Sequence, residues 1–181
     1  VRNGQTSRSQ GTLSEAASSM NVGQASSILW MDAAETYFLL AEAKLRLNLG
    51  DKTVKEYYEE GVKTSFSSKG ASGAESYLDN DVNVPSTSFI DPTNGRNTDV
   101  SRMVSTLTVK WDESASPDKK LERIMVQKWI ALFPDGQEAW SEMRRTGYPG
   151  IVTINTNASG GEVATGELIS RLKFPTKEYS D

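Results

Sequence analysis

Acidic side chains are the residues of this sequence with the clearest capacity for chemistry. The run Asp79-Asn80-Asp81-Val82-Asn83 imitates the start of a calcium loop, in which alternate side-chain oxygens bind the ion. Such a loop needs glycine at its sixth position and glutamate at its twelfth, where this sequence has Val84 and Ile90. We therefore expect a polar turn and no metal site, with a looser calcium site as the alternative.

Paired carboxylates are the second chemical possibility, because a glycosidase works with two of them. The acids available are Glu59-Glu60, Glu122, Glu138 and Glu142. All fall in segments that we expect to be helical, where charged side chains usually form a solvated face. A carboxylate hydrolase is therefore the weakest functional hypothesis, and we predict no catalytic residue.

Histidine and cysteine are both absent from the chain. Their absence excludes Ser-His-Asp and Cys-His catalysis, thiolate metal sites and the usual imidazole ligation of zinc, copper or haem. Gly160-Gly161 lies in no strand–loop–helix context, so a phosphate loop has no support. We expect no cofactor.

Two amphipathic segments predict a helical hairpin. Ala34, Phe38 and Ala41 recur at helical spacing in a helix expected from about Leu29 to Leu49, with Tyr37 and Leu45 beside them and Glu35, Glu42, Lys44 and Arg46 on its wetter side. A second helix, beginning near Asp51, carries Val54, Tyr58, Val62 and Phe66 on one face. The small residues Ala41 and Gly61 would let the two helices approach closely. The pair spans about 35 residues, close to the tetratricopeptide unit.

A second helical pair is predicted around residues 116–147. Ser116-Pro117 suits a helix start, Pro134 ends that helix, Asp135 caps the next one, and Gly147 fits its C-terminal end. We expect Trp129 and Trp140 to be largely buried in this corner. We also expect Arg144 or Arg145 to meet a carboxylate or helix-end carbonyl groups.

The remaining segments are shorter or less regular. We expect an irregular N-terminal segment over residues 1–27, a short helix over 74–80, a helix over about 99–111 and a surface loop over 150–166. The fold class is therefore mainly α, with tetratricopeptide-like helical hairpins, further helices and long irregular loops. The net charge of −4 indicates no large basic surface for nucleic acid, and no apolar run approaches the roughly twenty residues of a membrane span.

Four stretches, in this order, resemble the SusD/RagB family of outer-membrane lipoproteins. The most specific is QKWIALFPDGQEAWSEMRRTGYP over residues 127–149. The others are AAETYFLLAEA from residue 33, KEYYEEGVKTSF from residue 55, and RLKFP with the EY pair near the C-terminus. The resemblance covers most of residues 30–180, and implies that residues 28–181 are the helical C-terminal part of a SusD-like domain whose N-terminal half is missing here.

The resemblance also implies a function and a location. Family members capture nutrients without catalysis at the outer face of a Gram-negative outer membrane and act as a lid on a TonB-dependent transporter, their partner. They are lipid-anchored through an N-terminal cysteine absent from this chain. We expect an oligosaccharide ligand, with a peptide as an alternative. The competing hypothesis is a helical-repeat module that binds a protein and no nutrient.

Ligand contacts, if this chain supplies them, are expected in the irregular region 70–112. Sugar rings stack on exposed aromatic faces, while their rims need hydrogen bonds. The candidate ligand-binding residues are Tyr77, Phe89, Arg96 and Trp111. No binding motif of the family transfers residue by residue, so these four rest on residue type and position.

Overall fold

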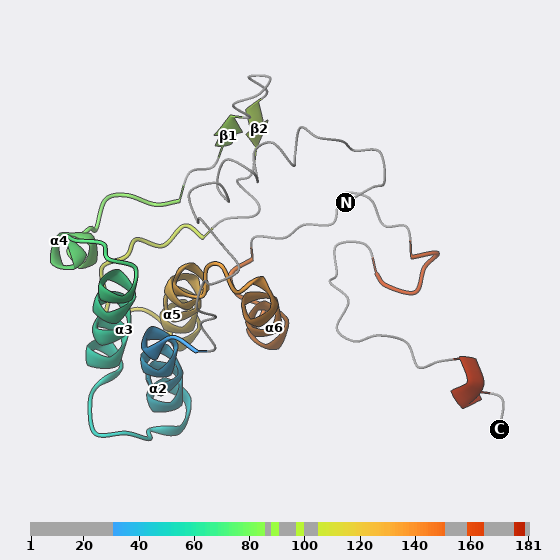
Figure 1. Cartoon of the computed structure of the whole chain (residues 1–181), viewed down its shortest axis with the longest axis horizontal. Coiled ribbons are helices and arrows are strands. Elements are labelled where there is room, and N and C mark those ends of the chain that lie inside the picture. The colour runs from blue at the N-terminus through green and yellow to red at the C-terminus, as the bar shows by residue number, and fades with distance from the viewer. Residues whose placement is uncertain are drawn as a thin grey trace, which may run out of the picture.

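The computed structural model describes residues 31–85, 88–90, 97–99, 105–150, 159–164 and 176–179, and at 88–90 and 97–99 it describes the backbone alone. These residues are mainly helical, as predicted (Figure 1). The helices are α2 (Ala33–Leu47), α3 (Val54–Ser68), α4 (Ala74–Leu78), α5 (Pro117–Ala131) and α6 (Gly136–Thr146), with a 3-10 turn at Thr176–Tyr179. Strands β1 (Ser88–Ile90) and β2 (Asn97–Asp99) form a short antiparallel pair. The predicted irregular segment 1–27 lies outside the described residues.

Helices α2 and α3 form the predicted tetratricopeptide-like hairpin (Figure 1). The side chain of Asp32 caps α2, and Asn48 ends it in the left-handed conformation. Thr53 and Glu56 cap α3 reciprocally, a capping box that fixes its first turn. A Cβ atom on Gly61 would lie 2.8 Å from the ring of Phe38, so only glycine allows α3 to approach α2 this closely.

Helices α5 and α6 form the predicted corner with the predicted caps. Ser116 caps α5 with Pro117 in its first turn, Asp135 caps α6, and Gly147 ends α6 with a φ of 77°. The peptide bonds before Pro134 and Pro149 are cis. Helix α5 packs on both α2 and α3, whereas α6 packs on α5.

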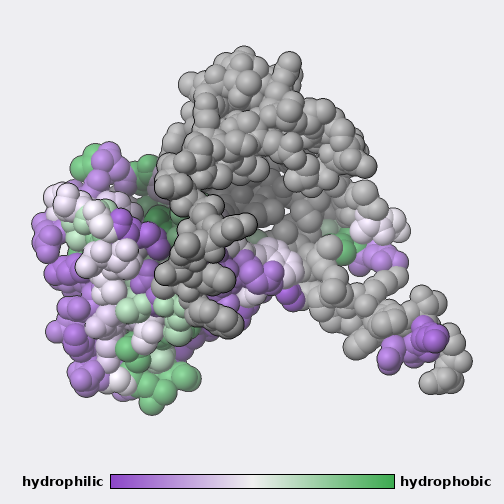
Figure 2. Space-filling model, in the orientation of Figure 1, coloured by the Kyte–Doolittle hydropathy of each residue, from purple (hydrophilic) through white to green (hydrophobic). Residues whose placement is uncertain are grey.

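The core lies where α2, α3 and α5 meet. Its largest fully buried side chains are Tyr58, Phe38, Lys128, Ile124 and Met125. On the face seen in Figure 2, the described helical part is mostly hydrophilic, with separate apolar patches. Among the described residues, no helix combines the length and the hydropathy that crossing a membrane requires.

The helix predicted over residues 99–111 is wrong. Asp99 ends strand β2, and residues 105–111 are not helical. Their backbone serves other partners: the hydroxyl of Tyr58 donates to the carbonyl of Val109 at 2.6 Å, and Arg123 Nε donates to the carbonyl of Thr108 at 3.0 Å. In the sequence, Met103, Leu107 and Trp111 recur at four-residue spacing, which favours a helix. The structure differs because the carbonyl groups of Thr108 and Val109 accept hydrogen bonds from α5 and α3.

Candidate functional site

A pocket of about 150 Å³ opens where α2, α3, α4 and α5 converge. It is lined almost entirely by apolar atoms. The lining residues are Phe38, Val62, Ser65, Phe66, Tyr77, Gln127 and Ile130. Phe38 and Val62 form its buried floor, and Ile130, with 48% of its surface exposed, stands at its mouth.

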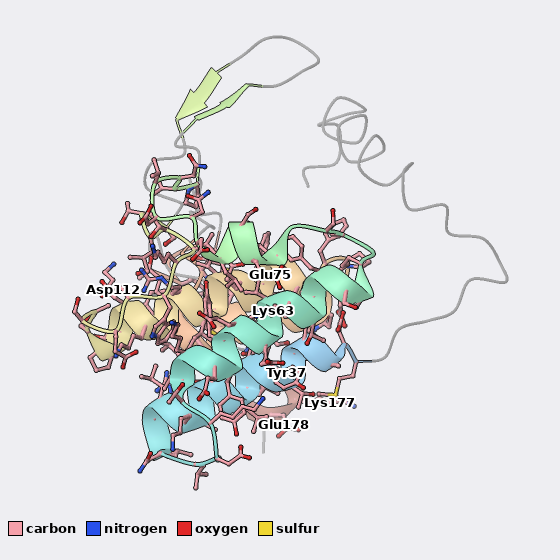
Figure 3. All side chains as sticks on the ribbon, turned by 90° about the vertical axis from the view of Figure 1, so that its left-hand side faces the viewer. Tyr37, Lys63, Glu75, Asp112, Lys177 and Glu178 are labelled. Carbon is pink, nitrogen blue, oxygen red and sulfur yellow. The ribbon has the colours of Figure 1, made fainter. Side chains whose placement is uncertain are left out.

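Helix α4 brings Tyr77, one of the four predicted ligand contacts, to this pocket. Gly70 and Gly73, both with positive φ, let the chain turn from the end of α3 into α4 (Figure 3). The ring of Tyr77 then lies 5.2 Å from that of Phe66, and its hydroxyl donates to Gln127 Oε1 at 3.0 Å. Tyr77 is thus half-buried, held by one ring and one amide.

The other three predicted contacts lie elsewhere. Trp111 belongs to the core, with 9% of its surface exposed, a ring contact to Tyr58 and its indole N–H directed to Glu113. Phe89 is in strand β1, where the backbone alone is described, and Arg96 lies outside the described residues. The structure therefore does not bring the four together, and ligand binding at them stays a prediction.

Sequence reasoning missed most of the pocket. Gln127 and Lys128 are polar, but they lie on the face of α5 that is turned to the core. Their spacing from Ile124 and Ala131, three or four residues, shows that all four share this face. A polar residue on an apolar helix face must satisfy its hydrogen bonds inside the protein. This signal in the sequence points to the pocket, which Gln127 lines, and to the ion pairs of Lys128.

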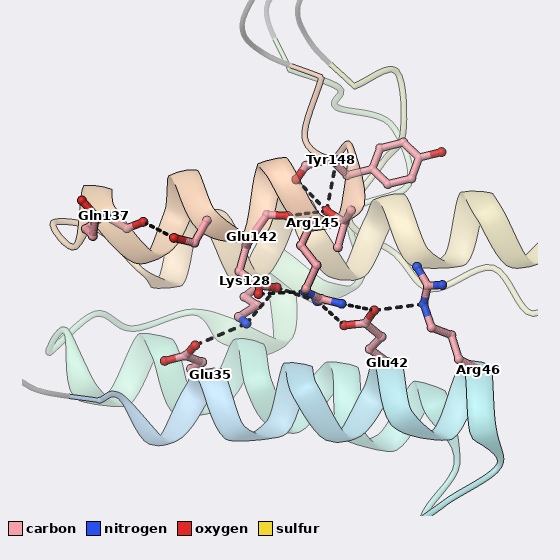
Figure 4. Close-up of polar contacts among 10 residues, drawn as sticks. Glu35, Glu42, Arg46, Lys128, Gln137, Glu142, Arg145 and Tyr148 are labelled. Carbon is pink, nitrogen blue, oxygen red and sulfur yellow. Dashed lines mark hydrogen bonds and ion pairs between the residues drawn. The ribbon is translucent and has the colours of Figure 1, made fainter. Parts of the chain in front are cut away.

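A cluster of charged side chains joins α2, α5 and α6 (Figure 4). The side chain of Lys128 is 1% exposed, and its Nζ lies 3.3 Å from Glu35 Oε1 and 3.0 Å from Glu142 Oε2. Neither contact is aligned as a hydrogen bond, so Lys128 is held as an ion pair. Arg145 donates to Glu42 through both terminal nitrogens and also bonds Glu142, while Arg46 pairs with Glu42 at 2.9 Å.

This cluster confirms one prediction and corrects another. Arg145 meets carboxylates, as expected for one of the two arginines. Glu35 and Glu42, expected on the wetter side of α2, are instead 8% and 6% exposed. They are buried because α5 and α6 place cations above them, which the pattern of α2 alone could not reveal.

The protonation of Glu142 follows from these contacts. Burial acts to raise its pKa, but the hydrogen bonds from Arg145 and the positive charge of Lys128 outweigh burial and hold the pKa below its ordinary value. Glu138, which also lies near Lys128, behaves in the opposite way. Burial, together with the negative charge of Glu35, raises the pKa of Glu138. The cluster is therefore a set of neutralised pairs with one additional carboxylate at its edge.

The predicted burial of Trp129 and Trp140 is wrong, because each has 39% of its surface exposed. The guanidinium carbon of Arg144 lies 4.3 Å from the centre of the Trp140 ring. Neither indole lines the pocket described above. The face of α6 that is buried carries Ala139 and Met143.

The polar run after α4 forms a turn, as predicted. Asn80 Oδ1 accepts hydrogen bonds from the backbone N–H groups of Val82 and Asn83, and Asp81 pairs with Lys110. Among the described residues there is no group of three or more acidic side chains that could hold a metal ion. The turn thus uses its oxygens within the chain.

Comparison with known proteins identifies the family. The whole chain, residues 1–181, matches the SusD-like family, described as "Susd and RagB outer membrane lipoprotein". No curated protein matches the chain. A chitin-binding SusD homologue from Flavobacterium johnsoniae is 41% identical, with a TM-score of 0.73 over 84% of this chain and 31% of its own.

Two further solved structures agree. A SusD homologue from Bacteroides uniformis is 39% identical, with a TM-score of 0.77, and one from Bacteroides thetaiotaomicron is 42% identical, with a TM-score of 0.72. Each alignment covers 88% of this chain and 33% of the relative, so the chain spans about a third of their length. On the match along the whole sequence and these structural similarities, the chain belongs to the SusD/RagB family.

Proposed function

We propose that the protein to which this chain belongs captures nutrients, chiefly oligosaccharides, without catalysing a reaction. The observation that carries the proposal is the 41% identity to the chitin-binding SusD homologue from Flavobacterium johnsoniae. The family description supports a place in the outer membrane, where the protein would be anchored by a lipid. The chain would then contribute the helical scaffold and part of the ligand-facing surface.

The ligand-facing surface is proposed around Tyr77 and the β1–β2 pair. Tyr77 and Phe89 are aromatic residues that could stack on the C–H faces of a sugar, and Arg96 could bond its hydroxyl rim. Trp111 is the fourth candidate, and its burial leaves little of the indole for a ligand. Tyr77 is therefore the first of the four to substitute.

The ionisable groups of the described residues support binding without catalysis. Three carboxylates on the helices are held by structural partners: Glu42 and Glu142 bond Arg145, and Glu122 bonds Ser105 and Lys119. A glycosidase needs an acid and a base flanking the bond that it cuts. Carboxylates held in ion pairs between helices are poorly placed for that role.

Titration calorimetry of the full-length protein tests this function. The panel contains chitooligosaccharides, cellooligosaccharides, maltooligosaccharides and short peptides. We expect saturable binding of at least one oligosaccharide series and no release of products after prolonged incubation. A folded protein that binds no member of the panel would contradict nutrient capture, and hydrolysis of a bound sugar would contradict the non-catalytic role.

The proposed partner is a TonB-dependent transporter, to which the captured ligand is delivered. Affinity purification of the full-length protein from solubilised outer membranes, followed by mass spectrometry, tests this partner. We expect a large β-barrel transporter to copurify with and without added glycan. Recovery of another protein, combined with no glycan binding, would favour a helical-repeat interaction module instead.

A further inference from the structure

The C-terminal end of α5 carries large apolar side chains at its surface. Over residues 121–128 the helix is buried around most of its circumference. The next six residues, WIALFP, include no charged side chain. The helical winding continues through them, since the N–H of Phe133 donates to the carbonyl of Ile130 at 3.3 Å. Three of them, Trp129, Ile130 and Phe133, remain exposed and occupy neighbouring positions, and we call these three residues the aromatic end of α5.

The tip of the α2–α3 hairpin provides a contrast. Leu47 and Leu49 are also exposed there, but charged and amide side chains lie between and beside them, at Arg46, Asn48 and Asp51. Single leucines among polar neighbours are common on protein surfaces, whereas a run of large apolar side chains marks an interface. The aromatic end of α5 is such a run.

The solved relatives indicate what covers this surface. The alignments with the homologues from Bacteroides uniformis and Bacteroides thetaiotaomicron cover 33% of each relative, so about two thirds of each lies outside the part shared with this chain. Parts of a protein that stay together permanently meet through apolar surfaces poor in charge, like a domain core cut in half. The composition of residues 129–134 fits a permanent contact of this kind.

We propose that the aromatic end of α5 is an internal interface of the full-length protein, covered by an apolar segment of the same polypeptide that lies outside these 181 residues. The covering segment packs apolar side chains against the rings of Trp129 and Phe133. Neither residue is a candidate ligand contact, so this interface does not depend on nutrient capture. Ile130 also borders the pocket beside Tyr77, and the experiments therefore use Trp129 and Phe133 alone.

Thiol labelling measures whether the surface is covered. The chain has no cysteine, so each variant introduces a single one, after any other cysteine of the full-length protein is replaced by serine. Phe133→Cys is compared with Leu49→Cys, because Phe133 and Leu49 are equally exposed in this structure, at 57% and 58%. In the monomeric full-length protein, Phe133→Cys should react at least about tenfold more slowly, since the interface must open first. Trp129→Cys should be protected in the same way.

Thermal unfolding of the full-length protein provides a second measurement. Phe133→Ala removes a ring from the interface and leaves a cavity, so the melting temperature should fall by about 3 °C or more. The matched control is Leu49→Ala, at the hairpin tip, which should change it by less than about 1 °C. Circular dichroism at low temperature shows whether each variant is folded, and the labelling comparison stands even where Phe133→Ala does not fold.

Four results would overturn the proposal. Equal labelling of Phe133→Cys and Leu49→Cys in the monomer would mean that the surface is open. Protection found only in a dimer, identified by light scattering, would assign the surface to a second copy of the protein. Protection found only after an outer-membrane transporter is added would assign it to that partner. Protection found only with an added oligosaccharide would make it a ligand surface.

Discussion

Helix α2 lies between α3 and α6 (Figure 1), and it contacts α3 through apolar packing and α6 through ion pairs. Toward α3, Phe38 packs on Gly61 and meets the ring of Tyr58. Toward α6 the backbones stay apart, since no Cα atom of α2 lies within 8 Å of one in α6. Charged side chains join these two helices. Glu42 bonds Arg145 directly, and Glu35 is linked to Glu142 through Lys128 of α5. One contact is apolar and close, and the other is ionic and spaced. The two should therefore respond differently to substitution and to pH.

Truncation of Phe38 should have the largest effect on stability. Phe38→Ala removes a fully buried ring beside Gly61 and leaves a cavity, so the free energy of unfolding should fall by roughly 3–5 kcal/mol. Urea denaturation measures the loss. The matched control is Leu39→Ala, on the exposed side of the same helix, which should cost at most about 1 kcal/mol. Equal losses would show that the buried ring of Phe38 does not hold α2 against α3.

Removal of the buried cation should come next. Breaking a buried ion pair costs roughly 3–5 kcal/mol, and we expect Lys128→Met to cost less, about 2–3 kcal/mol, because Glu142 keeps Arg145. The double variant Lys128→Met with Glu35→Gln should recover part of that loss, since the unpaired charge is removed. A double-mutant cycle with no coupling between Lys128 and Glu35 would mean that this ion pair adds no stability.

Exchange of the arginines should have a smaller effect. Arg145→Lys loses the bidentate contact with Glu42 and should cost about 0.5–1 kcal/mol, a modest value because the side chain is 46% exposed and partly screened by solvent. Arg144→Lys is the control, since Arg144 contacts the ring of Trp140 and no carboxylate among the described residues. In thermal unfolding, Arg145→Lys should melt at a lower temperature than Arg144→Lys. The same melting temperature in both variants would argue against the bidentate contact.

Acid should weaken the ionic side selectively. A carboxyl group whose pKa is lowered on folding stabilises the folded state at any pH above its unfolded pKa, which is near 4.5 for Glu142. This stabilisation is lost as the pH falls through the lower pKa of the folded state. Glu142→Gln should therefore be less stable than the parent at pH 7, and the difference should shrink below about pH 4.5. Protonation of Glu138, whose pKa is raised, opposes this trend. A difference independent of pH would exclude an ionised Glu142 from the cluster.

The sequence predicted the apolar side of the molecule better than the ionic one. The spacing of Phe38, Tyr58 and Val62 located the hairpin, and the caps at Ser116, Asp135 and Gly147 located the corner. These features depend on residues close together in the chain. The partners of Glu42 and Glu35 lie on other helices, so the pattern of α2 placed both acids in solvent.

The failures at the tryptophans and at residues 99–111 have a related cause. Trp129 recurs at helical spacing with Leu121 and Ile124, which favours burial. The neighbouring helices do not cover every apolar residue here, and Trp129 and Phe133 remain at the surface. Residues 105–111 look helical by spacing, yet their carbonyl groups bond Tyr58 and Arg123. Of the candidate site, the sequence supplied Tyr77, and the buried amide of Gln127 was visible only as a polar residue in an apolar row.

The separation of Glu42 from Arg145 along the chain, 103 residues, has a consequence for the order of folding. The hairpin α2–α3 closes a short loop, whereas the bond between α2 and α6 requires a loop about five times longer, with a larger entropic cost of closure. We expect α2 and α3 to form early and α6 to join late. In the native protein, amide hydrogens of α6 should then exchange with solvent through local opening, well before those of α3.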